Sequence, residues 1–228
     1  MKKLLFLVLA IATVSICYAQ REVFPVSWDS VTVIVNHNPD SVASLVKRMS
    51  ATTLDTSLTY EERRLAFYGQ SLLTKDEEDI HSSDLSKLLK AAKYEESLSK
   101  AEEMLAINPL CLEALVSAEH SVLKMVKAGS NKWKMDDAAV YYNRAMRIYN
   151  TIATTGDGSA EHPFYVTKVA DEYNFMRHYL DLWAYASQAL VGMCDKFTLK
   201  EGSQYYDDST IYFEASRPIQ KLQAIFGM

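Results

Sequence analysis

The chain contains few of the residues that mark common chemical sites. Its 228 residues include only seven glycines and three cysteines, and no block of lysine and arginine stands out. No CxxC or HExxH pair is present, no glycine-rich loop ends in lysine, and no serine occupies a nucleophile elbow. The sequence therefore predicts no metal site and no cofactor. Without a basic block, nucleic acid is a poor candidate for a partner.

Hydrophobic residues nevertheless make up 49% of the chain, and its net charge at pH 7 is −5. This composition can bury a core and differs from that of a disordered chain. The length allows one large domain or two small ones.

The longest apolar run lies at the N-terminus. Two lysines precede an apolar stretch over about residues 4–16, and Ala19 comes just before the polar Gln20. This is the pattern of a secretory signal peptide, whereas a retained anchor would need roughly 20 apolar residues. We predict a signal peptide over residues 1–19, cleavage between Ala19 and Gln20, and export to the periplasm or the medium. No later run is long enough to span a membrane.

The cysteines raise two further questions. Cys17 could be a lipid anchor, but lipoprotein processing needs a small residue before the cysteine and this chain has Ile16. We therefore expect Cys17 to leave with the signal peptide, which changes the net charge to −7 because two lysines leave as well. Cys111 and Cys194 remain, and they could pair in an oxidising envelope. Both lie in apolar surroundings, where free cysteine behaves as a small hydrophobe, so we favour two free thiols.

Residues 20–40 are difficult to assign. Val31, Val33 and Val35 alternate with other residues, which locally predicts a strand. A helical part follows over 41–155. In it Thr59 and Glu62 form a capping box at a helix start. Spacings of three and four then predict one apolar stripe on each of three helices. The stripe residues are Tyr94, Leu98, Ala101 and Leu105 on the first helix, Leu115, Ala118, Val122 and Met125 on the second, and Ala138, Tyr141, Ala145, Ile148 and Ile152 on the third.

Residues 93–109, with Glu113-Ala114-Leu115 after them, resemble the second helix of a tetratricopeptide repeat running into the next repeat. Only about one repeat matches, and a stacked array needs at least three. The resemblance therefore implies a repeat-like helical hairpin.

Beyond residue 155 the pattern changes. The sequence predicts three strands, over 164–169, 188–199 and 209–214, and two helices, over 171–183 and 216–227. The predicted fold class is α+β: mainly helical with a repeat-like hairpin, then a small mainly antiparallel sheet flanked by helices. We expect one domain over 41–227, with the sheet in 156–227.

Several segments in order resemble a bacterial family catalogued as domain of unknown function 4919. These segments are Asp55–Thr59 leading into Phe67–Gly69, then Asn108-Pro109, Gly156–Gly158, Asp171–Tyr173 and Ile211–Glu214. The resemblance covers roughly residues 40–226. It implies export, one compact unit and a more helical 30–35 region, but no reaction.

The stretch from Gly156 to His162 is the most site-like. Glycines permit unusual turns, and Asp157 between two of them could bind a cation or orient a polar ligand. In the structural alternative, Gly156 ends the preceding helix in a left-handed cap and Asp157 braces the turn. A calcium loop would need more oxygen ligands at regular spacing.

Asp171 and Glu172 are the second candidate. Adjacent carboxylates can act in acid–base chemistry when one is buried beside a partner, whereas acids at a helix start usually cap it and favour its dipole. Together with Asp157 and His162 they could meet in space. His120 and His178 show no metal spacing and are interpreted as ordinary helix residues.

Two functions follow from these observations. The first is a non-enzymatic envelope or secreted module that binds a protein or peptide of the cell envelope through its helical hairpins. The alternative is a hydrolase that uses an acidic cluster around Asp157, His162, Asp171 and Glu172.

Overall fold

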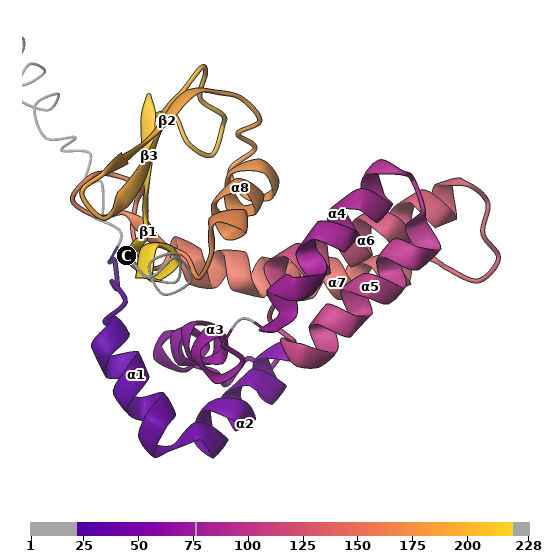
Figure 1. Ribbon diagram of the computed structural model, residues 1–228, viewed down its shortest axis with the longest axis horizontal. Coiled ribbons are helices and arrows are strands. Elements are labelled where there is room, and N and C mark those ends of the chain that lie inside the picture. Colours follow the sequence, from indigo (N-terminus) through magenta and orange to yellow (C-terminus); the bar gives the residue numbers. More distant parts are fainter. Residues whose placement is uncertain (1–21, 76, 221–228) are drawn as a thin grey trace, which may run out of the picture.

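The computed structural model describes residues 22–220 except residue 76. These residues form a mainly helical α+β fold with a small sheet, which confirms the predicted fold class (Figure 1). The predicted signal peptide, with its cleavage point between Ala19 and Gln20, lies outside the described residues. The final predicted helix is helical over 216–220, and its continuation to Gly227 also lies outside them. No helix in the described part of the chain is both long and apolar enough to cross a bilayer.

Helices come first and strands last, except that one helix lies between the first two strands. In chain order they are α1 (Trp28–His37), α2 (Pro39–Ser50), α3 (Tyr60–Leu73), the 3-10 helix η1 (Glu77–His81), α4 (Ser82–Lys90), α5 (Tyr94–Ile107), α6 (Leu112–Lys127), α7 (Met135–Ala153), β1 (Phe164–Tyr165), α8 (Val169–His178), β2 (Tyr185–Val191), β3 (Cys194–Leu199) and β4 (Thr210–Glu214).

The strand predicted around Val31–Val35 is wrong, because these residues belong to α1. The Ser27 hydroxyl caps this helix by accepting a hydrogen bond from the Ser30 backbone N–H. Val31 and Val35 are four residues apart, so a helix buries both on one side. Valines two residues apart fit a strand locally. The segment forms a helix instead, because tertiary packing buries residues four apart. The helical 30–35 region implied by the family resemblance is therefore confirmed.

The capping box at the start of α3 is confirmed. The Thr59 hydroxyl accepts from the Glu62 N–H at 3.2 Å, and the Glu62 carboxylate accepts from the Thr59 N–H at 2.8 Å. Farther along α3, a Cβ added at Gly69 would lie 2.8 Å from the Val42 Cγ1 atom. The glycine therefore allows α2 to pack closely on α3.

The middle of the chain folds as predicted from its periodicity. The stripe residues named for α5, α6 and α7 are buried except Tyr94 and Tyr141, which are half-buried and pack against the core. Helices α5, α6 and α7 pack on one another in sequence order, and α4 packs on α5 (Figure 1). The likeness of α5 and α6 to a tetratricopeptide repeat stays an interpretation of the sequence.

The sheet has the strand order β1-β4-β3-β2, with β1 parallel to β4 and the other pairs antiparallel. The strand predicted over 188–199 is in fact a hairpin, since β2 and β3 turn at Gly192. Gly192 has a φ of +63°, which a two-residue turn between antiparallel strands requires. The continuous apolar run concealed this turn. The strand predicted over 164–169 is limited to the two residues of β1.

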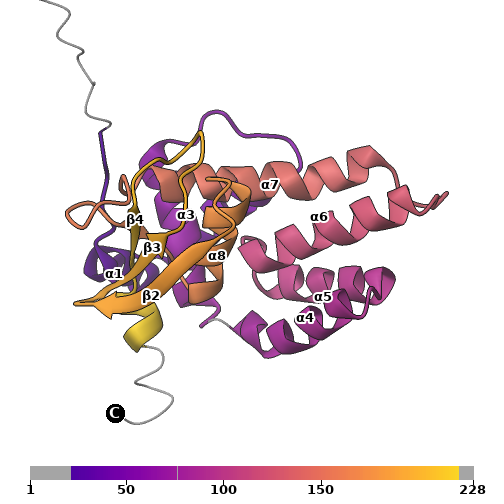
Figure 2. The same cartoon turned by 90° about the horizontal axis from the view of Figure 1, so that it is seen from above.

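Helix α8 lies between the sheet and the α4–α6 helices in both views (Figures 1 and 2). On the sheet side, the Phe175 ring meets the Phe213 ring edge-on at 6.2 Å. The helix is shorter than the predicted 171–183, because it ends at His178 and Asp181 adopts a φ of +55°. Buried residues of the helical part and of the sheet part belong to one contiguous core.

Candidate functional site

Asp157 and His162 lie in the loop between α7 and β1, and both are exposed. The His162 carbonyl accepts hydrogen bonds from the N–H groups of Asp157 and Gly158 at 2.9 and 3.0 Å. The Asp157 carboxylate accepts from the Ser159 N–H at 2.9 Å. Asp157 therefore braces this turn, as the structural alternative predicted.

Gly156 does not form the predicted left-handed cap. The residue with positive φ is Gly158, at +86°. A Cβ at Gly156 would lie 2.2 Å from the Pro163 carbonyl oxygen and 2.4 Å from that of His162. Glycine is thus needed at position 156, because the loop brings two carbonyl oxygens to the place that a Cβ atom would occupy.

Asp171 lies buried in the first turn of α8. Its Oδ2 atom accepts from the Thr167 hydroxyl at 2.7 Å and from the N–H groups of Thr167 and Lys168 at 3.2 and 3.3 Å. These bonds confirm the capping role predicted for it. Burial raises the pKa of Asp171 to about 6, although Lys168 and these hydrogen bonds act in the opposite direction.

Glu172 is fully buried beside Asp195 of β3. Burial raises its pKa to about 9, and the negative charges of Asp195 and Asp171 add to this effect. Glu172 is therefore a neutral carboxylic acid at pH 7.

The four predicted site residues thus lie in two environments, one exposed loop and one buried helix start. Among the hydrogen bonds and ion pairs of the described residues, none joins Asp157 or His162 to Asp171 or Glu172. In the same part of the chain, no group of three or more His, Cys, Asp or Glu side chains could hold a metal ion.

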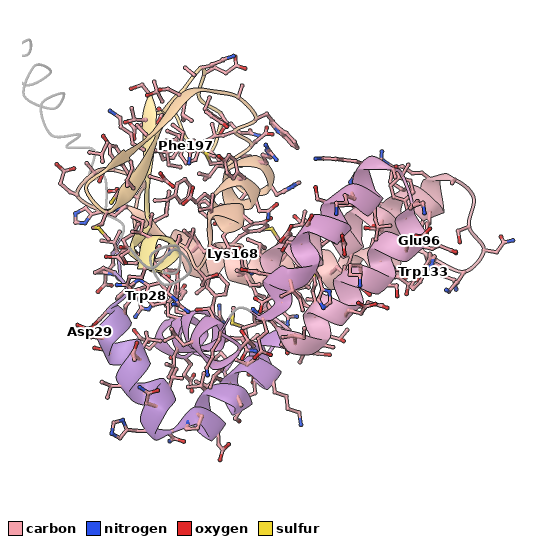
Figure 3. All side chains as sticks on the ribbon, viewed as in Figure 1. Trp28, Asp29, Glu96, Trp133, Lys168 and Phe197 are labelled. Carbon is pink, nitrogen blue, oxygen red and sulfur yellow. The ribbon has the colours of Figure 1, made fainter. Side chains whose placement is uncertain are left out.

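A partly buried polar network that the sequence did not reveal surrounds Lys168, which is labelled in Figure 3. Its Nζ atom lies 3.1 Å from Glu78 Oε1 and 2.5 Å from Asp79 Oδ1, and Asn108 donates to Glu78 at 2.7 Å. The network links η1 and the α5–α6 connection to the start of α8. It holds the helical part against the sheet part.

Cys111 lies within this region and is also buried. Burial raises the pKa of its thiol to about 12, although the nearby Lys168 opposes the shift. Such a thiol is a poor nucleophile at neutral pH. Cys111 and Cys194 are both free, as we predicted.

A groove lies on the side of α8 that faces the helical part. It is a cleft of about 720 Å³ between α4 and α6 on one side and α8 on the other. We call it the α6/α8 groove, and it is lined by Ser86, Leu89, Lys90, Glu113, Val116, Ser117, Glu119, His120, Leu123, Ala170, Tyr173, Asn174, Arg177 and His178. None of the four predicted site residues is among them.

The two histidines of the groove come from different walls, His120 from α6 and His178 from α8. Desolvation lowers the pKa of both histidines. Nearby lysines add to this shift for His120. Arg177 and the imidazole of His120 add to it for His178. Both rings are therefore neutral at pH 7 and can donate or accept hydrogen bonds. Burial raises the pKa of Glu119 on the same wall.

Two further contacts shape the α8 wall. The Arg177 guanidinium lies over the Tyr173 ring, 5.6 Å from its centroid. The Tyr173 hydroxyl donates to the side chain of Gln188 in β2 at 2.6 Å. This wall is thus held in place by the sheet behind it.

The sequence carries one signal of this groove. Helix α6 has a second apolar stripe, with Val116 and Leu123 seven residues apart beside His120. Its first stripe, through Leu115 and Val122, fills the core. A helix with apolar residues on two sides needs a second neighbour or a ligand.

Comparisons with known proteins give a family but no activity. A family model matches residues 32–224. No curated protein and no solved structure matches the chain. The match covers most of the chain and confirms the resemblance found in the sequence, so the protein belongs to the family described as Domain of unknown function (DUF4919).

Proposed function

We propose that the protein is a non-enzymatic binding module that holds a segment of a partner polypeptide in the α6/α8 groove. The observation that carries the proposal is the groove itself. Its volume of about 720 Å³ lies within the range of roughly 300–1,000 Å³ typical of ligand-binding clefts.

The chemistry of the lining favours a polypeptide over a small charged ligand. Leu89, Val116 and Leu123 offer apolar surface for side chains. The charged residues are of both signs, so the groove does not select an anion or a cation. The two neutral imidazoles can pair with both the N–H and the C=O groups that a peptide presents.

A displayed library of random peptides, selected on the immobilised protein, tests the proposal. Peptides that are selected would be synthesised and titrated calorimetrically. We expect the combined variant His120→Ala with His178→Ala to weaken binding at least about tenfold, which corresponds to about 1.4 kcal/mol. The matched control is His37→Ala, because His37 is an exposed histidine of α1 outside the groove.

Two outcomes would contradict this function. One is a library that yields no peptide above background at any stage of selection. The other is a set of peptides that bind the groove variant as tightly as the wild-type protein.

We also propose that the protein acts outside the cytoplasm, because of the signal-peptide pattern in residues 1–19. The test is expression of the full chain in a bacterium, followed by fractionation and intact-mass measurement. We expect a periplasmic or secreted protein whose first residue is Gln20. An uncleaved chain in the cytoplasmic fraction would refute the proposal.

The hydrolase alternative has less support. It requires Asp157 and His162 to act with Asp171 and Glu172, and these pairs differ in exposure. Asp171 and Asp157 already have structural hydrogen bonds.

A further inference from the structure

Strand β2 is an edge strand that remains open. It lies at the end of the sheet, where β3 is its neighbour on one side (Figure 2). All seven of its residues are exposed. Leu190 is 57% exposed and Val191 is 51% exposed. In the described part of the chain, no strand pairs with its outer side.

The devices that usually protect such an edge are missing. Proteins shorten edge strands or place charges, prolines or bulges on them. The opposite edge strand, β1, has two residues. Strand β2 has no charged residue and no proline, and its one irregularity lies at its start, between Tyr185 and Ser187. Residues 187–191 therefore present a regular, uncharged edge.

The strand is also held in position. The Tyr185 ring meets the Phe197 ring edge-on at 5.2 Å and lies 6.2 Å from the Tyr173 ring. The Gln188 side chain accepts a hydrogen bond from Tyr173 at 2.6 Å. An edge that is already ordered loses little conformational entropy when another strand pairs with it.

We propose that β2 pairs with β2 of a second copy of this chain, antiparallel across a two-fold axis. The two four-stranded sheets would then join into one. Pairing about Ala189 uses only the regular residues 187–191 and places the small Ala189 side chains next to each other at the axis. It sets Leu190 against Gln188 and Val191 against Ser187, so no like charges face one another. A two-fold contact of this kind is closed, because it uses the β2 edge of both copies and leaves only the short β1 strands at the two ends of the joined sheet. This inference is independent of the groove.

The experiment measures the mass of the purified full chain by light scattering after gel filtration, over a wide range of concentrations. We expect the wild-type protein to change from monomer to dimer as its concentration rises. Ala189→Lys should remain monomeric at every concentration, because two lysines would meet at the axis. Ala189→Glu should do the same. An equimolar mixture of the two variants should form dimers again, since opposite charges then meet. The matched control is Asn131→Lys, in the loop between α6 and α7, which should dimerise like the wild-type protein.

Hydrogen exchange gives a second readout that needs no variant. Amides of residues 185–191 should exchange more slowly as the concentration rises, while those of α4 should not change. A wild-type chain that is monomeric throughout would overturn the proposal, and so would a dimer that Ala189→Lys leaves intact. A monomer that instead accepts an added extended peptide along β2 would also overturn it.

Discussion

Glu172→Gln should remove a pH dependence from the stability of this protein. Glu172 is fully buried, and its pKa of about 9 in the folded state compares with 4.5 for an unperturbed glutamate. Between these two pH values the folded state holds one proton more than the unfolded state. The free energy of unfolding must therefore fall as the pH rises through this window.

The size of this effect follows from the proton difference. One bound proton changes the free energy of unfolding by about 1.4 kcal/mol per pH unit. Between about pH 7 and pH 8 the free energy of unfolding of the wild-type protein should fall by roughly 1 kcal/mol. The lowered pKa values of His120 and His178 act in the opposite direction and reduce this loss. The raised pKa of Asp171, about 6, also makes the free energy of unfolding fall as the pH rises, but only below about pH 6.

Urea unfolding at several pH values between about 7 and 8 measures this slope. The stability of Glu172→Gln should be nearly independent of pH in this range. At about pH 8 the variant should be more stable than the wild-type protein by up to roughly 5 kcal/mol, because this pH lies about 3.5 pH units above the pKa of an unperturbed glutamate. Glu95→Gln is the matched control, because Glu95 is exposed on α5. The reasoning is refuted if Glu172→Gln keeps the slope of the wild-type protein, which would mean that Glu172 is ionised when buried.

Two further predictions concern stability. Lys168→Met leaves the Glu78 carboxylate buried without its cation, so it should lower the free energy of unfolding, measured in urea, by about 3–5 kcal/mol. Adding Glu78→Gln should recover part of this loss. A Lys168→Met variant as stable as the wild-type protein would contradict this role for the ion pair. Gly156→Ala places a Cβ 2.2 Å from the Pro163 carbonyl oxygen and should lower the melting temperature more than Gly129→Ala does. At Gly129 the space for a Cβ is open, although the φ is +85°. Equal melting temperatures of the two variants would contradict the argument from close approach.

The local structure of the helical part could be predicted because short-range rules decide it. Thr59 and Glu62 lie three residues apart and satisfy one another's backbone groups within one turn. The stripes of α5 to α7 have the spacing of one helix face, and their burial matched it. Predictions were wrong where two structures suit the same residues. The valines of α1 alternate as in a strand, but packing of α1 against α3 buries every fourth residue.

The candidate site was harder to predict. Asp171 was correctly predicted to cap α8, since the capping atoms are near neighbours in the chain. The burial of Glu172 depends on β3, which follows more than twenty residues later and brings Asp195 beside it. His120 and His178 were interpreted as ordinary helix residues, and each is unremarkable on its own helix. They line one groove because α8 lies between the sheet and α6.

By itself, the sequence determined the fold class, the helix periodicity and the family, because each depends on residue order and on contacts within a few turns. It also carries the signal-peptide pattern. The tertiary structure alone decided which carboxyls lose their solvent, which histidines share a groove and which strand is left at the edge. These properties depend on the packing of segments that are far apart in the chain. Desolvation and unpaired backbone groups arise only when such segments are in place.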